Sequence, residues 1–202
     1  MTVWRGVKPL ILASQSRARQ ALLANADIAF ETIPADIDER LIHRASGLSA
    51  PGDVAALLAR EKALSVSSRH AGRFVVGADQ TLALGARLFS KPAGRSQAAG
   101  QLQALAGRTH ELHSAVAVAR DAEILFADVS VARMTMRSLD DGAISTYLDA
   151  AGEAVFASVG AYQVEGLGIH LFEHIAGDHF TILGLPLPPL LEFLRSRQLL
   201  AI

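Results

Sequence analysis

The chain has 202 residues, of which 50% are hydrophobic and 19% are charged, a composition typical of a soluble globular protein with one full core or two small lobes that share one. Its formal net charge of -1 argues against a broad electrostatic footprint for nucleic acid, and the lack of cysteine excludes disulfides, thiolate metal sites and cysteine nucleophiles. No apolar run is long enough to span a bilayer, and Met1 to Lys8 is too short and polar for a signal peptide, so we expect a single cytoplasmic domain over residues 1–202.

The first predicted strand, Pro9–Ala13, runs into a polar turn, Ser14–Arg19, and then a helix, Gln20–Ala26. Backbone N–H groups at the helix start, two hydroxyls and two arginines together make a phosphate cradle. The turn lacks the glycine and lysine of a P-loop. The same residues also fit an ordinary helix N-cap with surface arginines, and the turn alone does not separate the two interpretations.

The second predicted strand, Phe30–Ala35, ends in a run of acids, Asp36-Ile37-Asp38-Glu39-Arg40. Three acids in four positions could bind a hard cation through oxygen. A run of this kind is also typical of a solvated loop.

A helix is predicted from Ser49–Asp53, where a proline lies near the first turn, to about Arg69. Its apolar stripe consists of Val54, Leu57, Leu58 and Leu64. Glu61 falls within that stripe and Lys62 lies beside it, four residues after Leu58. Charges against the core are unusual, so they indicate a buried ion pair, a lysine whose stem is buried, or groups that reach into a site.

The stretch Phe74–Thr81 starts as a buried strand, Phe74–Val76, and then loses side-chain bulk at Gly77 and Ala78. Asp79 follows at the predicted carboxyl end of that strand, where open α/β sheets bind ligands. The next turn would bring Lys91 back towards it. The alternative is that Asp79 caps a turn and Lys91 is a solvated surface lysine.

The rest of the chain alternates strands and helices, which predicts a mixed α/β domain with helices on the faces of a central sheet. The predicted elements are a hairpin at Thr81–Phe89 around Gly85, a helix at Arg95–Ala106, strands at Thr109–Ala119 and Ile124–Arg137, a helix from the capping box Ser138–Asp141 through Ala150, a glycine-rich loop at Ser158–Gly168, a strand at Ile169–Ile175, and a final helix through Arg197.

Taken together and in this order, the motifs of the chain resemble those of the Maf family of nucleoside triphosphate pyrophosphatases. The resemblance covers about Leu10 to Gln198. It rests on Leu12-Ala13-Ser14-Gln15-Ser16-Arg17-Ala18-Arg19, Pro34-Ala35-Asp36-Ile37-Asp38-Glu39, Glu61-Lys62-Ala63, Gly77-Ala78-Asp79-Gln80, Lys91-Pro92, Ser158 to Gly168, and Gly184-Leu185-Pro186-Leu187.

The resemblance implies an α/β fold of two lobes with a cleft between them, related to the inosine triphosphatase type. It also implies hydrolysis of a nucleoside triphosphate to the monophosphate and pyrophosphate with a divalent cation, Mg²⁺ or Mn²⁺. Family members are often homodimers. The family has also been associated with inhibition of septum formation, so a nucleotide-binding regulator with little turnover is the alternative.

The family's functional positions map onto this sequence residue by residue. Ser14, Ser16 and Arg19 match the serines and arginine of the first loop, and Lys62 matches the helix lysine. Glu39 matches the acid after the second strand, which helps to hold the metal. Asp79 matches the proposed proton acceptor, with a role as metal ligand beside Glu39 as the open alternative, and Lys91 matches the lysine after the hairpin.

Three further positions are associated with base choice in the family, and here they hold Ala18, Gln80 and Glu165. Many members have arginine, threonine and glutamine there and prefer thymidine and uridine triphosphates. A sister group that prefers 7-methyl-GTP has glutamine and glutamate at the last two, and this sequence is closest to that subgroup. It departs at Ala18, where the subgroup has tryptophan, and at Arg17, where proline is usual. A glutamate near the base accepts hydrogen bonds from the N1–H and N2–H₂ edge of guanine.

Overall fold

The computed structural model describes residues 3–202; Met1 and Thr2, the start of the N-terminal segment, lie outside the described residues. The strands are β1 (Leu10–Leu12), β2 (Phe30–Thr32), β3 (Val75–Leu84), β4 (Arg87–Phe89), β5 (Thr109–Arg120), β6 (Glu123–Met136) and β7 (Phe172–Ala176). The α-helices are α1 (Arg17–Asn25), α2 (Glu39–Ser46), α3 (Pro51–Ser67), α4 (Arg95–Leu105), α5 (Asp141–Ala151), α6 (His179–Ile182) and α7 (Leu187–Ser196), and three short 3₁₀ helices are η1 (Gly152–Ala157), η2 (Val159–Ala161) and η3 (Leu167–Leu171). Within residues 3–202 we find no helix with the length and apolar character that a membrane crossing requires.

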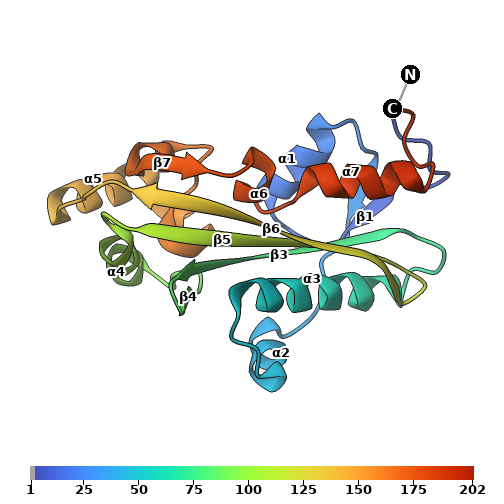
Figure 1. Ribbon diagram of the computed structural model, residues 1–202, viewed down its shortest axis with the longest axis horizontal. Coiled ribbons are helices and arrows are strands. Elements are labelled where there is room, and N and C mark those ends of the chain that lie inside the picture. The colour runs from blue at the N-terminus through green and yellow to red at the C-terminus, as the bar shows by residue number, and fades with distance from the viewer. Residues whose placement is uncertain (1–2) are drawn as a thin grey trace.

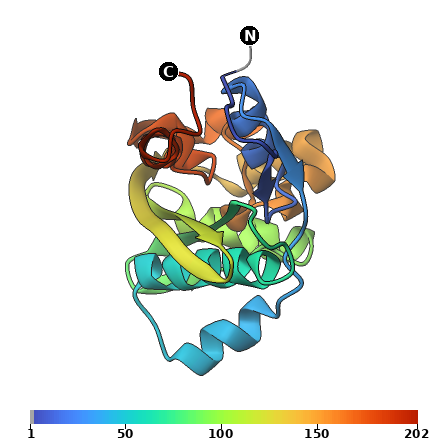
Figure 2. The same cartoon turned by 90° about the vertical axis from the view of Figure 1, so that its right-hand side faces the viewer.

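One seven-stranded mixed sheet organises the molecule, with the order β2-β1-β3-β5-β6-β7 and β4 beside β3. Strand β1 is parallel to both β2 and β3, and the other pairs are antiparallel. The long strands β3, β5 and β6 run along the length of the molecule (Figure 1), with α1 and α7 on one face of the sheet and α3 on the other (Figure 2). The predicted fold class, a mixed sheet flanked by helices, is confirmed.

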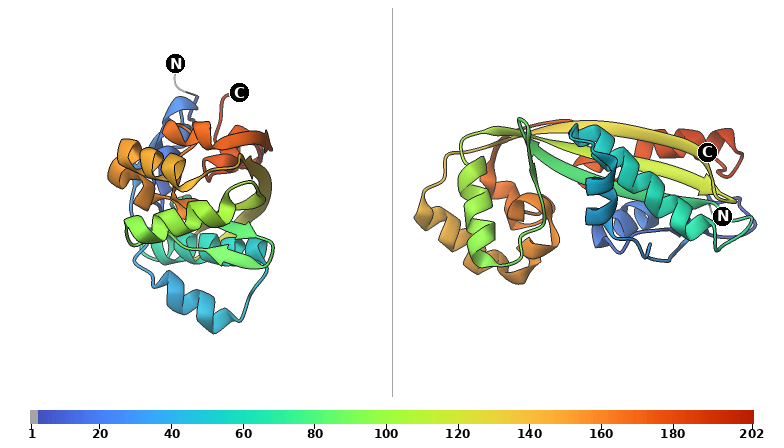
Figure 3. Two further views of the ribbon diagram at one scale, coloured as in Figure 1. Left: turned by 90° about the vertical axis from the view of Figure 1, so that its left-hand side faces the viewer. Right: turned by 90° about the horizontal axis from the view of Figure 1, so that it is seen from below.

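Two hydrophobic cores lie at opposite ends of the long strands, on the same face of the sheet. The terminal lobe contains β1, β2, α1 and α7 and packs around residues such as Leu12, Val76 and Phe193. The distal lobe contains α4, α5 and the 3₁₀ helices and packs around residues such as Leu82 and Met134. Figure 3 shows the two groups of helices at the two ends of the strands. Both chain ends belong to the terminal lobe, where Trp4 pairs with Leu200.

The prediction that the third strand ends before Asp79 is wrong. Strand β3 continues through Asp79, Gln80 and Thr81 to Leu84, and it pairs with β5 from Val75 to Ala83. A polar run in a central strand is costly unless each side chain finds a partner. Each does: Asp79 meets Lys62, the Gln80 amide meets Ser114, and the Thr81 hydroxyl donates to the carbonyl of Pro51.

Three further elements differ from the sequence prediction. Helix α2 begins inside the acid run, at Glu39, where the sequence predicted no helix; Asp38 caps its start and Gly47, in the left-handed region at φ 67°, ends it. Helix α5 begins at Asp141 with Asp140 as its cap, two residues after the predicted capping serine. The segment predicted as the strand Ile169–Ile175 starts as η3 and becomes β7 only at Phe172.

Helix α3 buries two residues of its predicted apolar stripe, Val54 and Leu58, but it lies against the sheet mainly through alanines. Ala55, Ala59 and Ala63 pack on a row of alanines of β5, whereas Leu57 and Leu64 are only half-buried. The helix backbone approaches β3 so closely at Gly77 that an added Cβ would overlap the Ala59 carbonyl and lie 2.6 Å from the Ala63 nitrogen. Gly77 is therefore required for this close approach.

We expect Gly77→Ala to destabilise the protein by about 1–3 kcal/mol, because the added methyl group must push α3 off the sheet. The control is Gly100→Ala within α4, where an added Cβ meets nothing within 4 Å and alanine should stabilise by about 0.5–1 kcal/mol. The free energy of unfolding in urea measures both. A Gly77→Ala protein as stable as the native chain would contradict the close approach.

His110 is buried in the distal lobe, and its Nε2 lies 2.7 Å from the hydroxyl oxygen of Tyr162. Its Nδ1 is also buried and has no hydrogen-bond partner among the described residues. Burial lowers the pKa of the imidazole from 6.5 to about 4. The folded state therefore holds His110 neutral, and the stability linked to it is present above about pH 6.5 and is lost as the pH falls towards 4.

We expect His110 to contribute about 3 kcal/mol to the loss of unfolding free energy between pH 7 and pH 4. In His110→Gln this loss should be smaller by that amount, since no buried imidazole has to take a proton. The exposed residue His170 supplies the control, His170→Gln, which should behave as the native chain does. Equal acid sensitivity of the native chain and His110→Gln would refute the assignment.

Candidate active site

The edge of β3 has a gap between two neighbouring strands. Val75 and Val76 pair with β1, and Leu82 to Leu84 pair with β4 on the same side. No strand of the described residues covers that edge from Gly77 to Thr81. At this point the chain leaves β1 through the first loop and the start of α1. Open α/β sheets bind ligands outside the carboxyl ends of strands such as this one. Seven of the ten predicted site residues gather around this gap: Ser14, Ser16, Arg19, Glu39, Lys62, Asp79 and Gln80.

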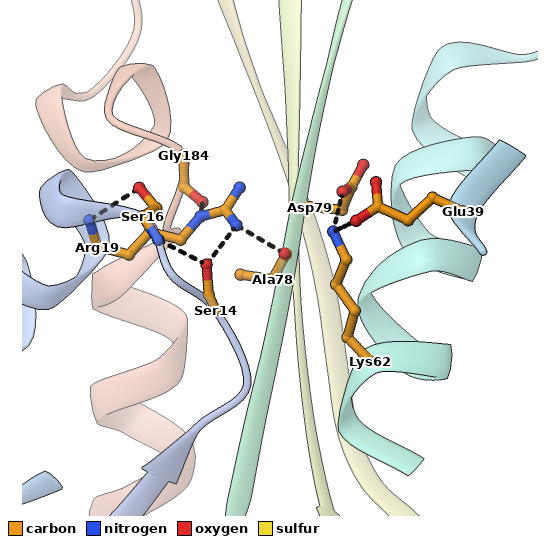
Figure 4. A network of polar contacts seen from close by, with 8 residues as sticks. All are labelled: Ser14, Ser16, Arg19, Glu39, Lys62, Ala78, Asp79 and Gly184. Atoms are coloured by element: carbon orange, nitrogen blue, oxygen red, sulfur yellow. Dashed lines mark hydrogen bonds and ion pairs between the residues drawn. The ribbon is translucent and has the colours of Figure 1, made fainter. Parts of the chain in front are cut away.

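Lys62 and two carboxylates form a cluster on the α3 face of the sheet (Figure 4). The Lys62 Nζ lies 2.6 Å from Asp79 Oδ1 and 2.9 Å from Glu39 Oε1. Lys62 and Asp79 are 9% and 7% exposed, whereas Glu39, the first residue of α2, is exposed. Of the three interpretations of the charges on α3, the buried ion pair is confirmed for Lys62; Glu61 is half-buried and outside it.

The cluster has unusual electrostatics for a strand interior. Burial raises the pKa of the Asp79 carboxyl above its ordinary value, and the positive charges of Lys62 and Arg19 oppose that shift. Burial also lowers the pKa of the Arg19 guanidinium, while Asp79 and Glu39 raise it. The charges of Arg19, Asp79 and Glu39 therefore act on one another, although these residues come from α1, β3 and α2.

Arg19 is held at the gap by three hydrogen bonds. Its Nε donates to the carbonyl of Gly184 at 2.7 Å, and its Nη1 donates to the carbonyl of Ala78 at 2.8 Å and to Ser14 Oγ at 3.1 Å. Ser16 caps α1 and accepts from the backbone N–H of Arg19. Nη2 makes no hydrogen bond within residues 3–202, so it is available to an anion. The first loop thus orients an arginine at a helix start, as a phosphate cradle requires.

Asp79 and Gln80 point to opposite faces of the sheet, because neighbouring strand residues alternate. Gln80 lies on the Arg19 side, where its Nε2 donates to Ser114 Oγ and to the carbonyls of Thr181 and Ile182. These acceptors fix which end of the amide is the nitrogen. The Oε1 atom of Gln80 makes no hydrogen bond within the described residues.

Three predicted site residues take no part in these contacts. Lys91 is exposed in the segment after β4 and makes no hydrogen bond or ion pair within residues 3–202. Ala18 is half-buried in the first turn of α1. Glu165 is exposed in a tight turn closed by hydrogen bonds from Gly166 and Gly168 to the Gln163 carbonyl, and its charge acts on Tyr147. The roles assigned to these residues stay predictions.

Asp79 and Glu39 also fit the predicted divalent cation. Both carboxylates meet the same ammonium nitrogen, and their other oxygens, Oδ2 and Oε2, make no hydrogen bond within residues 3–202. No group of three or more metal-binding side chains occurs in that part of the chain. Mg²⁺ is commonly held by one or two carboxylates together with water and substrate phosphates, so two carboxylates suffice.

Sequence reasoning missed three groups that the structure adds to the site. The carbonyls of Ala78 and Gly184 both bind the Arg19 guanidinium, and Ser114 binds Gln80. Backbone carbonyls carry no sequence signal, although Gly184 stands in a motif that the resemblance includes. A cavity of about 250 Å³ lies between α5 and η1, and one of about 170 Å³ lies between α4 and α5; none of the predicted site residues lines either.

Comparisons with known proteins agree with this arrangement of residues. The chain is 69% identical over 201 residues to a "Nucleoside triphosphate pyrophosphatase" of Rhodopseudomonas palustris (strain HaA2), and 68% identical over 202 residues to one of Bradyrhizobium diazoefficiens, with 100% of both chains covered in each case. A "7-methyl-GTP pyrophosphatase" of Brucella abortus is 53% identical over 94% of this chain and 96% of that one. The predicted closeness to the 7-methyl-GTP subgroup thus stays a prediction.

Among solved structures, a HAM1 protein from Coxiella burnetii is 19% identical, with a TM-score of 0.42 over 64% of this chain and 73% of that one. That likeness is too low to add to the fold assignment. The family model described as "Maf-like protein" matches residues 9–197, which include every predicted site residue. The chain therefore belongs to the Maf family.

Proposed function

We propose that this protein hydrolyses a nucleoside triphosphate to the nucleoside monophosphate and pyrophosphate, with a divalent cation. The observation that carries the proposal is the buried Asp79–Lys62 pair, which Glu39 joins beside the gap in β3 that Arg19 also lines. The name of the full-length relatives at 69% and 68% identity supports the same activity.

The reaction joins a water oxygen to the α-phosphorus and breaks the bond from that phosphorus to the bridging oxygen of the β-phosphate. Asp79 takes the proton of the attacking water through Oδ2, and pyrophosphate leaves with the electron pair of the broken bond. General-base groups of this kind accelerate reactions by about 10²–10⁴-fold. The burial of Asp79 suits the role, since it raises the affinity of the carboxylate for a proton.

Positive groups around the gap neutralise the phosphates. Arg19 binds a phosphate oxygen through Nη2, and Ser14, Ser16 and the N–H groups at the start of α1 bind the phosphate tail. Lys62 offsets the charge that develops as the bond breaks. Lys91, which is exposed and without a partner in the described chain, closes onto the pyrophosphate when the nucleotide is bound.

Glu39 would hold the divalent cation, Mg²⁺ or Mn²⁺, through its unbonded Oε2 together with the substrate phosphates, and Asp79 would join it through Oδ2 only before that oxygen takes the proton of the water. The cation supplies charge neutralisation at the phosphates. Lys62 holds the two carboxylates close together, with its Nζ 2.6 Å from Asp79 Oδ1 and 2.9 Å from Glu39 Oε1.

Ala18, Gln80 and Glu165 choose the base, and we propose a guanine-type base such as that of GTP or 7-methyl-GTP. The Gln80 amide nitrogen is occupied by acceptors of the protein, so Gln80 offers a ligand an acceptor oxygen. Glu165 offers only acceptors as well. Two acceptors favour a base edge that carries donors, as the N1–H and N2–H₂ edge of guanine does.

The test is pyrophosphate release from dTTP, UTP, CTP, GTP and 7-methyl-GTP, with and without Mg²⁺ or Mn²⁺. Metal-dependent release with the guanine nucleotides fastest is the expected result. A pyrimidine preference would show that the assignment of the base-choosing residues is wrong while leaving the reaction in place. Absence of release from all five would favour the nucleotide-binding regulator of septum formation.

We expect Glu165→Gln to lower kcat/KM for GTP and 7-methyl-GTP by roughly 10–100-fold and to leave UTP nearly unchanged, because one bidentate contact to a base edge is lost. Glu173→Gln, which changes an exposed glutamate of β7, is the matched control. An equal fall for purine and pyrimidine substrates would contradict base recognition by Glu165.

A further inference from the structure

We propose that Ser114 is a positioning residue of the active site, which sets the guanidinium of Arg19 through the carbonyl group of Gly184. The proposal rests on the proposed role of Arg19 at the phosphates. Ser114 lies in the middle of β5, opposite Gln80 of β3, and it is fully buried. It cannot touch a nucleotide, so any effect of Ser114 on turnover passes through other residues.

The first link joins Arg19 to the segment after α6. The shortest hydrogen bond of the guanidinium, at 2.7 Å, runs from Nε to the Gly184 carbonyl. Gly184 has φ of 87°, and an added Cβ there would lie 3.3 Å from Arg19 Nη2 and 3.6 Å from Gln80 Cδ. A side chain at position 184 would therefore contact both Arg19 and Gln80, so the two side chains lie on either side of this glycine backbone. The direction of the Gly184 carbonyl therefore sets the direction of Nη2, the one guanidinium nitrogen that makes no hydrogen bond within residues 3–202.

The second link joins Gly184 to α6. The backbone N–H of Gly184 donates to the Thr181 carbonyl at 3.0 Å. Helix α6 has only four residues, which is too short to hold its shape by its own hydrogen bonds. The side chain of Asp178 caps its start, but its end depends on contacts with the sheet.

The third link joins α6 to the sheet. The Thr181 carbonyl accepts from Ser114 Oγ at 2.7 Å and from Gln80 Nε2 at 3.1 Å, and Gln80 also donates to the Ile182 carbonyl. The Gln80 Nε2 in turn donates to Ser114 Oγ at 2.9 Å. The Thr181 carbonyl thus has three donors, of which the Ser114 hydroxyl makes the shortest hydrogen bond, and Ser114 Oγ also accepts from the Gln80 amide.

These links close a ring that starts and ends on β3. From Gln80 the ring passes through the end of α6, Gly184 and Arg19, and the Nη1 of Arg19 returns to the carbonyl of Ala78. Asp79 lies between the two ends of the ring on β3. A shift of α6 thus moves Arg19 relative to Asp79, and misplacement of a reacting or binding group by about 1 Å can cost 100-fold in rate.

The experiment is a double-mutant cycle of Ser114→Ala and Arg19→Lys, with pyrophosphate release measured for GTP and UTP. In the native background Ser114→Ala should lower kcat/KM by roughly 10-fold or more, by the same factor for both nucleotides. In the Arg19→Lys background, where the bond from Nε to Gly184 is absent, Ser114→Ala should have little further effect. Ser114→Cys, which keeps the volume but is a weaker donor, serves as the second variant.

The matched control is Ser130→Ala, which removes a hydroxyl from β6 directly opposite Ser114. It should keep the native rate. A full further loss from Ser114→Ala in the Arg19→Lys background would overturn the proposal, since it would indicate general damage to the fold. Native rates for both Ser114 variants, or an effect on one nucleotide alone, would overturn it as well. A native rate for Arg19→Lys together with Arg19→Ala would instead refute the role of Arg19 itself.

Discussion

Replacing Asp79 by asparagine is expected to lower the turnover of pyrophosphate release by about 100-fold or more. Asparagine keeps the shape of the side chain but has no charge and cannot take a proton from water. Lys62 retains Glu39 as an ion-pair partner at 2.9 Å, so α3 should keep its place. The loss should therefore fall mainly on kcat, with the saturation constant for the nucleotide changed much less.

Asp128→Asn is the matched control for this variant. Asp128 is also a strand aspartate, half-buried in β6, and accepts a hydrogen bond from Ser130 Oγ. Its replacement should leave turnover unchanged. A near-native kcat of Asp79→Asn would show that Asp79 is not the general base, whether or not the variant binds the metal more weakly.

The position of Asp79 shows what local sequence could and could not predict. The apolar run Phe74–Val76 predicted the buried start of β3 correctly, but Asp79-Gln80-Thr81 resembled the end of a strand. Partners far away in the sequence reverse that expectation: Lys62 is 17 residues before Asp79, and Ile182 is 102 residues after Gln80. A single window of sequence holds no information about such partners, so it favours a loop.

Helix α2 was missed for a different reason. The capping aspartate and the terminal glycine were both present in the sequence, but the helix has only eight residues and none of them is buried, so the core gives it no long apolar pattern. The acids at its start resembled a solvated loop. The family resemblance nevertheless pointed to Glu39, which lies at the first turn of this helix and meets Lys62.

Replacing Lys62 by methionine is expected to destabilise the protein by about 3–5 kcal/mol at neutral pH and to abolish most turnover. Methionine preserves the length and apolar stem of the side chain but leaves the buried Asp79 without its partner at 2.6 Å. The remaining positive charge near Asp79 is that of Arg19, which is already hydrogen-bonded to Ser14, Ala78 and Gly184. The control is Arg60→Met, two residues before Lys62 on the exposed side of α3, which should change stability by less than about 0.5 kcal/mol.

The double variant Lys62→Met/Asp79→Leu separates stability from function. Two apolar side chains in place of a buried ion pair are often neutral or stabilising by about 1–4 kcal/mol, because neither charge has to leave water. We expect urea unfolding to show that the double variant regains the stability lost in Lys62→Met while pyrophosphate release stays absent. That result would mean that the pair is retained for its chemistry at the expense of stability. A double variant less stable than Lys62→Met would instead show that the ion pair holds α3 on the sheet.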